Sequence, residues 1–446
     1  RAGWWRRNRN HQKLADRGTP ACIVQRHRKM WNNPDFRKMW WANAVSSLGS
    51  QITRLALPLT AVLVLHATPL EMGLLAACAT IPYLVAGLPA GAWIDRHARR
   101  PILIGCDVGR AVILLMIPLL ALGGWLALIH LYGIAILTGL LSLLFDLAEE
   151  AYLPAIVDRS ELVEGNSQLA AIDAASELAA PVVAGGLVQW LSAPLAVALD
   201  AATFLWSALW LSRIRVRETR PTSLPSEGLW VQIRVGLEYV IRSSVLRPIS
   251  LTGLQWQLFG GITDALLILY LSETLGLPPA AVGLVYAVGS LSALVGSRFS
   301  PTLTRKWGVG PLAITAAVMV GTGWLIVPFA AGTGWVAFAC VAAGLLVAGL
   351  GNLLWNVTTA SLVQATTPTG LLGRVNATGR VLTWGALPIG SLLGGWLGEV
   401  FGVRAAMVVA GVGVFSGAWW VWRSSLRQSL GPFSPGGMPD DSRPDA

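Results

Sequence analysis

The sequence predicts an all-helical integral membrane protein whose twelve spanning helices form two parallel six-helix bundles. Hydrophobic residues make up 54% of the 446 residues and charged residues only 13%, and the mean hydropathy is +0.59. A soluble domain carries about a quarter charged residues. Apolar runs of about 20 residues, the length that crosses a bilayer, recur along the chain, and the two halves share one pattern. Lipid must therefore be the solvent of this protein.

The spans are predicted to be helices because only helices and closed barrels satisfy every backbone hydrogen bond in hydrocarbon. The apolar runs are too long for the roughly ten-residue alternating strands of a membrane barrel. We place the spans at 40–65, 70–94, 102–128, 131–152, 168–190, 194–212, 249–271, 279–299, 311–331, 334–358, 378–398 and 403–423. The implied segments are a basic tail (1–38), an N-terminal bundle (39–212), a linker (213–248), a C-terminal bundle (249–423) and a C-terminal tail (424–446).

The Lys and Arg residues predict the orientation of the chain. With odd-numbered links outside, 30 of the 33 basic residues lie on one side, Arg404 lies on the other, and Arg54 and Arg110 fall inside spans. Positive loops mark the cytoplasmic side. We therefore expect both termini in the cytoplasm and the protein in a bacterial inner membrane. The net charge of +10 does not indicate nucleic acid, because the basic residues are confined to tails and loops.

The long linker contains a segment with helical amphipathicity from Leu229 onward. Its apolar side chains share one face and its charged side chains are spaced four apart on the other. The apolar face consists of Trp230, Ile233, Leu237, Val240 and Ile241, and the charged pairs are Arg234 with Glu238 and Glu238 with Arg242. We expect a helix on the inner membrane surface. A plain linker is the alternative.

The two halves superimpose without gaps when one is shifted by 210 residues. The shift aligns Pro69 with Pro279, Gly73 with Gly283, and Gly185 with Gly395, among other matches. Each unit holds an even number of spans, so both copies have the same orientation. Such parallel repeats are typical of transporters with two bundles, and they predict a site between the halves.

Polar residues recur at helical spacing within four predicted spans. They are costly in lipid and usually face a cavity or a partner helix. The candidates for a cavity or a coupling site are Asn43, Ser47, Ser50 and Arg54, then Ser142, Asp146 and Glu149, then Gln257 and Asp264, and finally Asn352 and Asn356. Asp173 and Glu177 are further candidate proton carriers, whereas Asp200 has no predicted role. We expect these helices to line one shared aqueous cavity.

Arg54 and Asp264 occupy equivalent positions in the two repeats. Opposite charges at symmetric places around one cavity are expected to face each other. One hypothesis is a gating or coupling pair that opens when Asp264 is protonated or substrate binds. The alternative is a structural ion pair that never breaks.

The residues that follow the second span carry a recognisable motif. The segment GAWIDRHARR contains Gly91, Asp95, Arg96, Arg99 and Arg100. It resembles the helix 2–3 signature of the major facilitator superfamily, with Ala98 where that family usually has Gly. The resemblance implies that Asp95 latches an inner gate against the start of the eleventh helix, with Arg380 as its partner.

Longer stretches resemble the macrolide-efflux and enterobactin-exporter branch of this superfamily. They include SSLGSQITRLALPLTAV and AYLPAIVDRSELVEGNSQ. The fifth span is similar to an antiporter signature, and the eleventh span repeats its character. The matching residues are Pro181, Gly185 and Gly186, and then Pro388, Gly394 and Gly395. Simple helix packing by small residues is the alternative. The branch implies the major facilitator fold and a functional monomer.

Together these features favour an exporter of amphipathic small molecules, such as macrolides, other drugs or a siderophore, driven by the proton gradient without a cofactor. An importer or facilitator of a polar metabolite, and a membrane sensor, are the alternatives. The sequence shows no phosphate loop and no nucleophile–His–acid set, and its four cysteines lack metal or disulfide spacing. Trp41, Trp256, Trp355 and Trp384 are candidates for stacking on substrate or for interface anchors.

Overall fold

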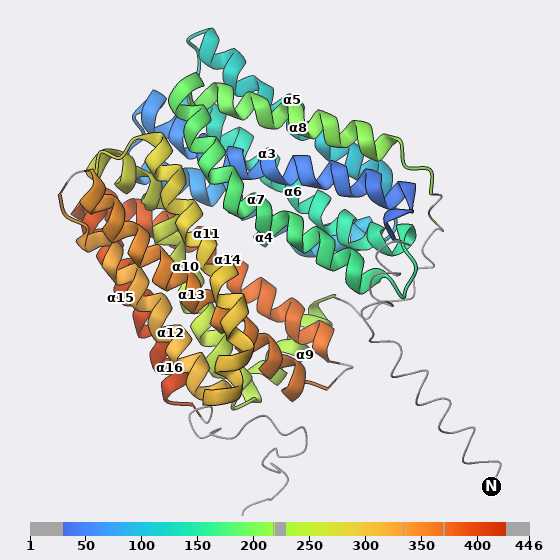
Figure 1. Ribbon diagram of the computed structural model, residues 1–446, viewed down its shortest axis with the longest axis vertical. Coiled ribbons are helices and arrows are strands. Elements are labelled where there is room, and N and C mark those ends of the chain that lie inside the picture. Colours follow the sequence, from blue (N-terminus) through green and yellow to red (C-terminus); the bar gives the residue numbers. More distant parts are fainter. Residues whose placement is uncertain (1–29, 217, 219–228, 333, 369–370, 425–446) are drawn as a thin grey trace, which may run out of the picture.

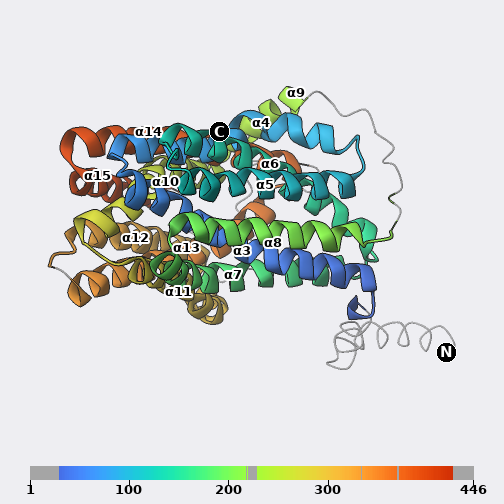
Figure 2. The ribbon, with the colours of Figure 1, turned by 90° about the horizontal axis from the view of Figure 1, so that it is seen from above.

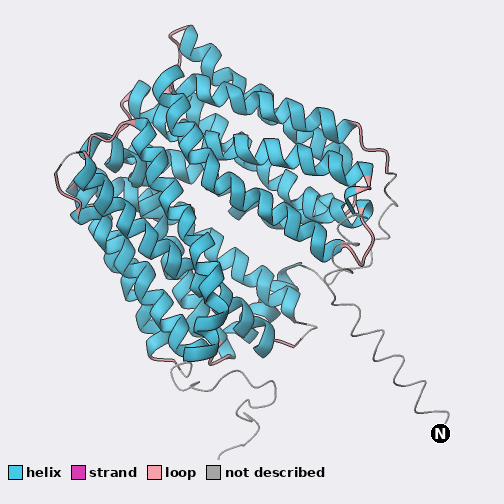
Figure 3. Cartoon of the chain, viewed as in Figure 1, coloured by secondary structure: helices cyan, strands magenta, loops and turns pink. Residues whose placement is uncertain are grey.

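The computed structural model describes residues 30–216, 218, 229–332, 334–368 and 371–424. Within these ranges the regular structure is helical and contains no strand (Figure 3). Ten helices in the described ranges are long and apolar enough to cross a membrane, and an eleventh has a shorter apolar part, Pro279–Ser292. The predicted all-helical membrane class is therefore confirmed.

The helices form two bundles that lie side by side, one blue to green and the other yellow to red (Figure 1; Figure 2 from above). The N-terminal bundle consists of α3 (Pro34–Leu65), α4 (Pro69–Ile94), α5 (Arg99–Leu122), α6 (Leu128–Ile156), α7 (Leu162–Leu191) and α8 (Ala193–Ser212). The C-terminal bundle consists of α10 (Leu246–Leu269), the π turn η2 (Tyr270–Thr274), α11 (Pro279–Trp307), α12 (Val309–Ile326), the 3-10 turn η3 (Val327–Phe329), α13 (Trp335–Thr366), α14 (Leu372–Phe401), α15 (Val403–Ser416) and α16 (Ala418–Trp422). If α15 and α16 count as one interrupted span, each bundle has six helices in the described ranges.

Several helices extend beyond their predicted ends. The first span begins at Pro34, because the Asn33 side chain accepts hydrogen bonds from the backbone of Asp35 (3.0 Å) and Phe36 (3.3 Å). Helical structure therefore reaches into residues 34–38, which the sequence analysis assigned to the tail. Conversely, α5 ends at Leu122 rather than 128, because Gly124 turns the chain with a φ of +71°. The predicted ends of the spans were placed where the apolar runs end, whereas the hydrogen bonding of a helix can continue into the neighbouring polar residues.

The internal repeat is visible in the helix limits. Both limits of α7 are displaced by 210 residues from those of α14, and α8 corresponds in the same way to α15 with α16. Equivalent helices also pack together: α5 lies against α6 and α8, as α12 lies against α13 and α15. The predicted parallel repeat is therefore confirmed at the level of helices and of their packing.

Two symmetric helix crossings join the bundles. Gly73 of α4 lies against Gly395 of α14, and Gly283 of α11 lies against Gly185 of α7. A Cβ atom on Gly73 would lie 2.6 Å from the carbonyl oxygen of Ser391. Small residues are therefore required for these backbones to approach. The packing interpretation is confirmed for Gly185 and Gly395, and also for Gly394, which contacts Ile262 within α10.

The crossings lie at one end of the molecule, where α3 leads into α4 and α7 leads into α8; we call this the closed end. Farther along α4, a Cβ atom on Gly87 or Gly91 would meet nothing within 4 Å, and the same holds for Gly379 of α14. The bundles therefore diverge toward the opposite end, as Figure 1 shows. We call that end the open end.

The linker forms a helix, α9 (Leu229–Arg242), so the plain-linker alternative is wrong for this segment. Glu238 and Arg242 form the predicted ion pair at 2.6 Å, whereas no ion pair between Arg234 and Glu238 is present among the residues described. Gly236 packs against the backbone of Arg374 and Val240 is buried. The helix thus rests on α14. The side chains of Trp230 and Ile233 lie outside the described set.

We expect Gly73→Val or Gly283→Val to weaken the closed end. The added side chain would overlap backbone atoms of the other bundle, and overpacking costs about 1–3 kcal/mol, a shift of about 5- to 150-fold in a conformational equilibrium. Electron paramagnetic resonance distances between spin labels at His66 and Glu273, after replacement of the native cysteines, would lengthen.

Gly186→Val is the matched control, because nothing lies within 4 Å of the position of its Cβ although the residue adjoins Gly185. The packing prediction for Gly186 is wrong for the same reason. Equal lengthening in the control, or none in Gly73→Val, would show that the crossings do not hold the closed end together.

Candidate functional site

Several polar side chains that were predicted to line a cavity meet inside the N-terminal bundle, and they come from three of its helices. Asn43 of α3 donates a hydrogen bond from Nδ2 to Oε1 of Glu149 on α6, at 2.6 Å. One turn farther along α3, Ser47 donates from Oγ to Oδ1 of Asp173 on α7, at 2.9 Å. The structure therefore joins candidates that are separated by more than 100 residues.

Other candidates are exposed although they lie in the middle of long helices. Asp264 is exposed, whereas its chain neighbours Thr263 and Ala265 are 2% and 1% exposed. We use the name polar chamber for the exposed residues Arg54, Asp146, Asp173, Glu177, Asp264, Asn352 and Asn356. Ser50, Ser142 and Gln257 are half-buried. The chamber residues come from both bundles, as the matched polar stripes predict.

Arg54 and Asp264 lie close enough for their charges to interact but form no ion pair among the described residues. The Arg54 charge acts on Asp264 of the other bundle and on Asp146 of its own. No ion pair joins Arg54 to Asp264 within the described part of the chain, and both side chains are exposed. Asn356 donates to Asn352 at 2.6 Å on the C-terminal wall. The chamber thus carries several acids, two amides and one guanidinium.

One aromatic contact joins the bundles beside these acids. Tyr83 of α4 donates a hydrogen bond from its hydroxyl to Oδ2 of Asp146, at 3.3 Å. Its ring stacks on Trp384 of α14, with centroids 5.5 Å apart and planes inclined by 20°. Tyr83 therefore connects an acid of the chamber to the opposite bundle. The sequence analysis did not identify it, because a tyrosine in an apolar run carries no distinctive spacing.

A buried charge cluster, consisting of Asp107 and Arg110 of α5 and Asp200 of α8, lies behind the chamber. Arg110 binds Asp107 at 2.5 Å and donates to Ser142 Oγ of α6 at 3.4 Å. Its guanidinium lies over the rings of Phe145 and Phe204, at 4.4 and 4.0 Å from their centroids. Arg110 is 4% exposed, and Asp107 and Asp200 are 0% and 1% exposed.

Sequence reasoning placed Arg110 inside a span but gave it no role, and it left Asp200 unassigned. A usable signal was present in Asp107 and Arg110, opposite charges three residues apart within an apolar run. Asp200 carries no such signal in the sequence. It joins the cluster only because α8 packs on α5.

The motif after α4 forms hydrogen bonds with the linker and with the end of α8. The backbone N–H groups of Arg99 and Arg100 donate to the two carboxylate oxygens of Glu218, each at 2.8 Å. Arg100 also donates to the carbonyls of Leu211 and Ser212 at the end of α8. Gly91 is half-buried, and Asp95 and Arg96 are exposed. The Arg380 side chain lies outside the described set, so its pairing with Asp95 stays a prediction.

The candidate tryptophans separate into two groups. Trp256 and Trp355 are 9% and 6% exposed and pack on each other at 4.8 Å within the C-terminal bundle. Trp256 also donates to the Val414 carbonyl at 3.0 Å. These two rings therefore pack inside the C-terminal bundle, and their stacking on a substrate stays a prediction. Trp41 and Trp384 are exposed.

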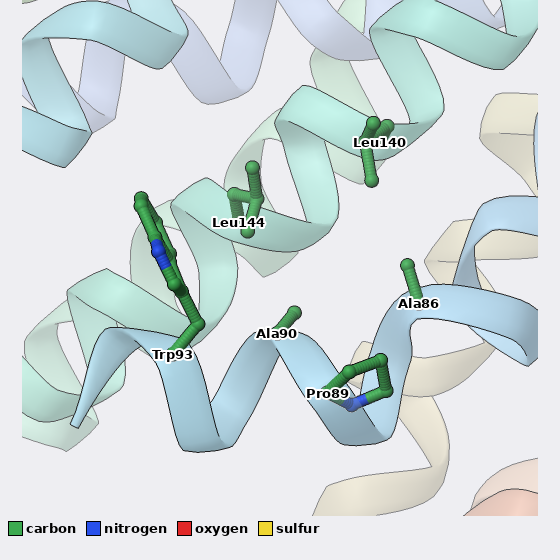
Figure 4. Close-up of a pocket in the computed structure, with 6 residues that line it drawn as sticks. All are labelled: Ala86, Pro89, Ala90, Trp93, Leu140 and Leu144. Atoms are coloured by element: carbon green, nitrogen blue, oxygen red, sulfur yellow. The ribbon is translucent and has the colours of Figure 1, made fainter. Parts of the chain in front are cut away.

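An apolar recess lies between α4 and α6. Its lining residues are Ala86, Pro89, Ala90, Trp93, Leu140 and Leu144. In Figure 4 the Trp93 ring stands beside α6, and Leu144 lies above Ala90. Apart from the Trp93 indole N–H, the lining is apolar, so the recess offers no charged side chain to a ligand.

Comparison with known sequences identifies one family. The Major Facilitator Superfamily model matches residues 39–387. The chain is 26% identical to the uncharacterized MFS-type transporter YfiS of Bacillus subtilis, covering 83% of this chain and 88% of that protein. It is 25% identical to the multidrug efflux pump Tap of Mycolicibacterium fortuitum, covering 82% and 90%. It is also 25% identical to the enterobactin exporter EntS of Salmonella typhimurium, covering 86% and 90%.

Solved structures share the fold at low identity. The nucleoside transporter NupG aligns with a TM-score of 0.70 at 10% identity, over 87% of this chain and 98% of that one. A bacterial homologue of the iron transporter ferroportin in its inward-facing state aligns with a TM-score of 0.67 at 19% identity, over 86% and 98%. In the outward-facing state the score is 0.55, at 18% identity over 87% and 98%.

We expect Arg110→Met to destabilise the protein by about 3–5 kcal/mol, because it leaves Asp107 buried without its counter-charge. The measurement is the thermal unfolding of purified protein in detergent. Arg242→Met is the matched control, since it breaks an exposed ion pair four residues apart on α9, worth about 0.3–0.5 kcal/mol. Similar losses in both variants would contradict a special contribution from the buried cluster.

Proposed function

The chain belongs to the major facilitator superfamily, and from this premise we propose that it is a secondary exporter of amphipathic small molecules driven by the proton gradient. The observation that carries the proposal is the polar chamber between two repeated bundles that are joined at one end. Such an arrangement suits alternating access, in which each bundle moves as a unit around a central site.

We propose that the open end faces the cytoplasm. Arg96, Arg99 and Arg100 lie at that end, and the sequence analysis groups them with 30 of the 33 Lys and Arg on one side. Positive residues favour the cytoplasmic side. The higher TM-score to the inward-facing ferroportin homologue, 0.67 against 0.55 for the outward-facing state, supports this conformation. Both tails would then lie in the cytoplasm of a bacterial inner membrane, with the monomer as the working unit.

The chemistry of the chamber favours neutral or cationic substrates over anions. Its charged residues are four acids and one arginine, so an anion would meet a net negative wall. The names of two relatives, a multidrug efflux pump and an enterobactin exporter, support export of drugs or of a siderophore. Trp384 offers an exposed aromatic face at the bundle boundary.

We assign coupling to Arg54 and Asp264. Because they act on each other across open space rather than through a bound pair, a proton or a cationic substrate at Asp264 would change the attraction between the bundles. In the opposite conformation the open end would close, and Gly91 and Asp95 would meet the start of α14. The hydrogen bonds between Glu218 of the linker and the start of α5 would then break.

We expect cells carrying the protein to accumulate less of at least one compound from a labelled panel of macrolides, dyes and a catecholate siderophore. The host is an efflux-deficient bacterium. A protonophore, Asp264→Asn and Arg54→Gln should each restore accumulation to the level of cells without the protein.

Glu273→Gln is the control variant, because Glu273 is an exposed acid in η2, at the closed end. It should transport like the wild type. Higher accumulation of any compound in wild-type cells would instead identify an importer, the alternative function. Export that survives both the protonophore and Asp264→Asn would remove the coupling assignment and leave export standing.

A further inference from the structure

The buried charge cluster contains two carboxyl groups, on Asp107 and Asp200, but only one basic group, on Arg110. Asp107 and Arg110 neutralise each other through their 2.5 Å contact. Asp200 is the remaining acid, 1% exposed, and would leave one uncompensated negative charge inside the bundle. Burial of an unpaired carboxylate is costly enough that such a group usually takes up a proton instead.

The hydrogen bonds around Asp200 indicate where that proton would sit. Oδ1 accepts from the Thr203 hydroxyl at 3.0 Å and lies against Gly49 of α3. Oδ2 is buried without a hydrogen-bond partner. The buried hydroxyl of Thr53 on α3 lies close enough to Asp200 to interact with it, but no hydrogen bond of ordinary distance and angle joins them. A proton on Oδ2, donated to the Thr53 hydroxyl, would satisfy both orphaned atoms at once.

The charged groups that face Asp200 are few. From α5 they are Asp107 and Arg110. From α3 its neighbours are Gly49 and Thr53, which carry no charge. The acids of α7, Asp173 and Glu177, are exposed. A metal ion is a poor occupant because the cluster already contains the Arg110 cation, whereas one proton balances the charge.

The second repeat shows that the fold does not need these charges. The positions 210 residues after Asp107, Arg110 and Asp200 are Ala317, Val320 and Ala410, which are 0%, 3% and 0% exposed. The same helix packing is thus achieved with apolar side chains. Apolar replacement of a buried ionic group is often neutral or stabilising, so retention of the charges in one half points to a use.

We propose that Asp200 is a proton-binding residue, and that the buried charge cluster holds one exchangeable proton behind the polar chamber. Arg110 links the two regions, since it contacts Ser142 of α6 and its charge acts on both Asp146 and Asp200. A change of charge in the polar chamber therefore changes the electrostatic energy of the buried charge cluster. This inference goes beyond the proposed export, and its test requires no substrate.

The test is infrared spectroscopy of purified protein at neutral pH. The wild-type spectrum minus that of Asp200→Asn should contain the C=O band of a protonated carboxyl group that shifts in heavy water. An ionised carboxylate band in its place would overturn the proposal. The spectrum of Asp146→Asn, which removes a chamber acid, should retain the Asp200 band.

Thermal unfolding at increasing pH gives a second readout. A site that is neutral in the folded protein stabilises it at low pH, and this stabilisation is lost as rising pH removes the proton. The wild type should therefore lose stability over a pH range in which Asp200→Asn does not. The proposal would be overturned if the thermal stability of the wild type, but not of Asp200→Asn, depended on the sodium concentration instead of on pH.

A variant that copies the second repeat separates folding from proton binding. The triple change Asp107→Ala, Arg110→Val and Asp200→Ala should give a folded, monodisperse protein that lacks the carboxyl band and the pH-dependent loss. If Asp200→Asn fails to fold, this variant provides the comparison. A triple variant that keeps the same band and pH dependence as the wild type would contradict the assignment to Asp200.

Discussion

The two glycine crossings, α4 with α14 and α7 with α11, are the contacts on which the rest of the arrangement depends. They let backbones of opposite bundles touch at the closed end, where side chains would hold them apart. Because helices are stiff, contact at one end and divergence beyond it determine where space opens between the bundles. The residues of the polar chamber come from both bundles, and the stacked Tyr83 and Trp384 join α4 to α14.

The repeat supplies two equivalent frames, but the buried charge cluster and the two acids of α6 beside it occur in only one of them. The N-terminal bundle contains Asp107, Arg110, Asp146, Glu149 and Asp200, and their counterparts are Ala317, Val320, Asn356, Thr359 and Ala410. Within lipid each such charge is costly. The C-terminal bundle therefore shows that these helices pack without charges at those positions. The N-terminal bundle has the same packing and carries the charges in addition. Asp264 is the acid that the C-terminal bundle contributes to the chamber.

The linker is anchored at both ends of its described part. Glu218 accepts from the backbone at the start of α5, and the backbone of Arg215 lies 3.4 Å from both oxygens of Asp35 on α3. At its other end α9 packs on α14. The linker thus connects the motif after α4 with the helix that the family resemblance makes its partner.

The sequence by itself determined the membrane class, the repeat with its offset, and the polar stripes, because these depend on composition and on helical periodicity. It missed the extent of helices such as α3, where Asn33 caps a segment that is not apolar. Only the tertiary structure decided which polar residues meet. Asp200 came to lie near Arg110 through the packing of α8 on α5, and Trp256 and Trp355 pack inside the C-terminal bundle. Such contacts join residues distant in the chain, and local pattern carries no information about them.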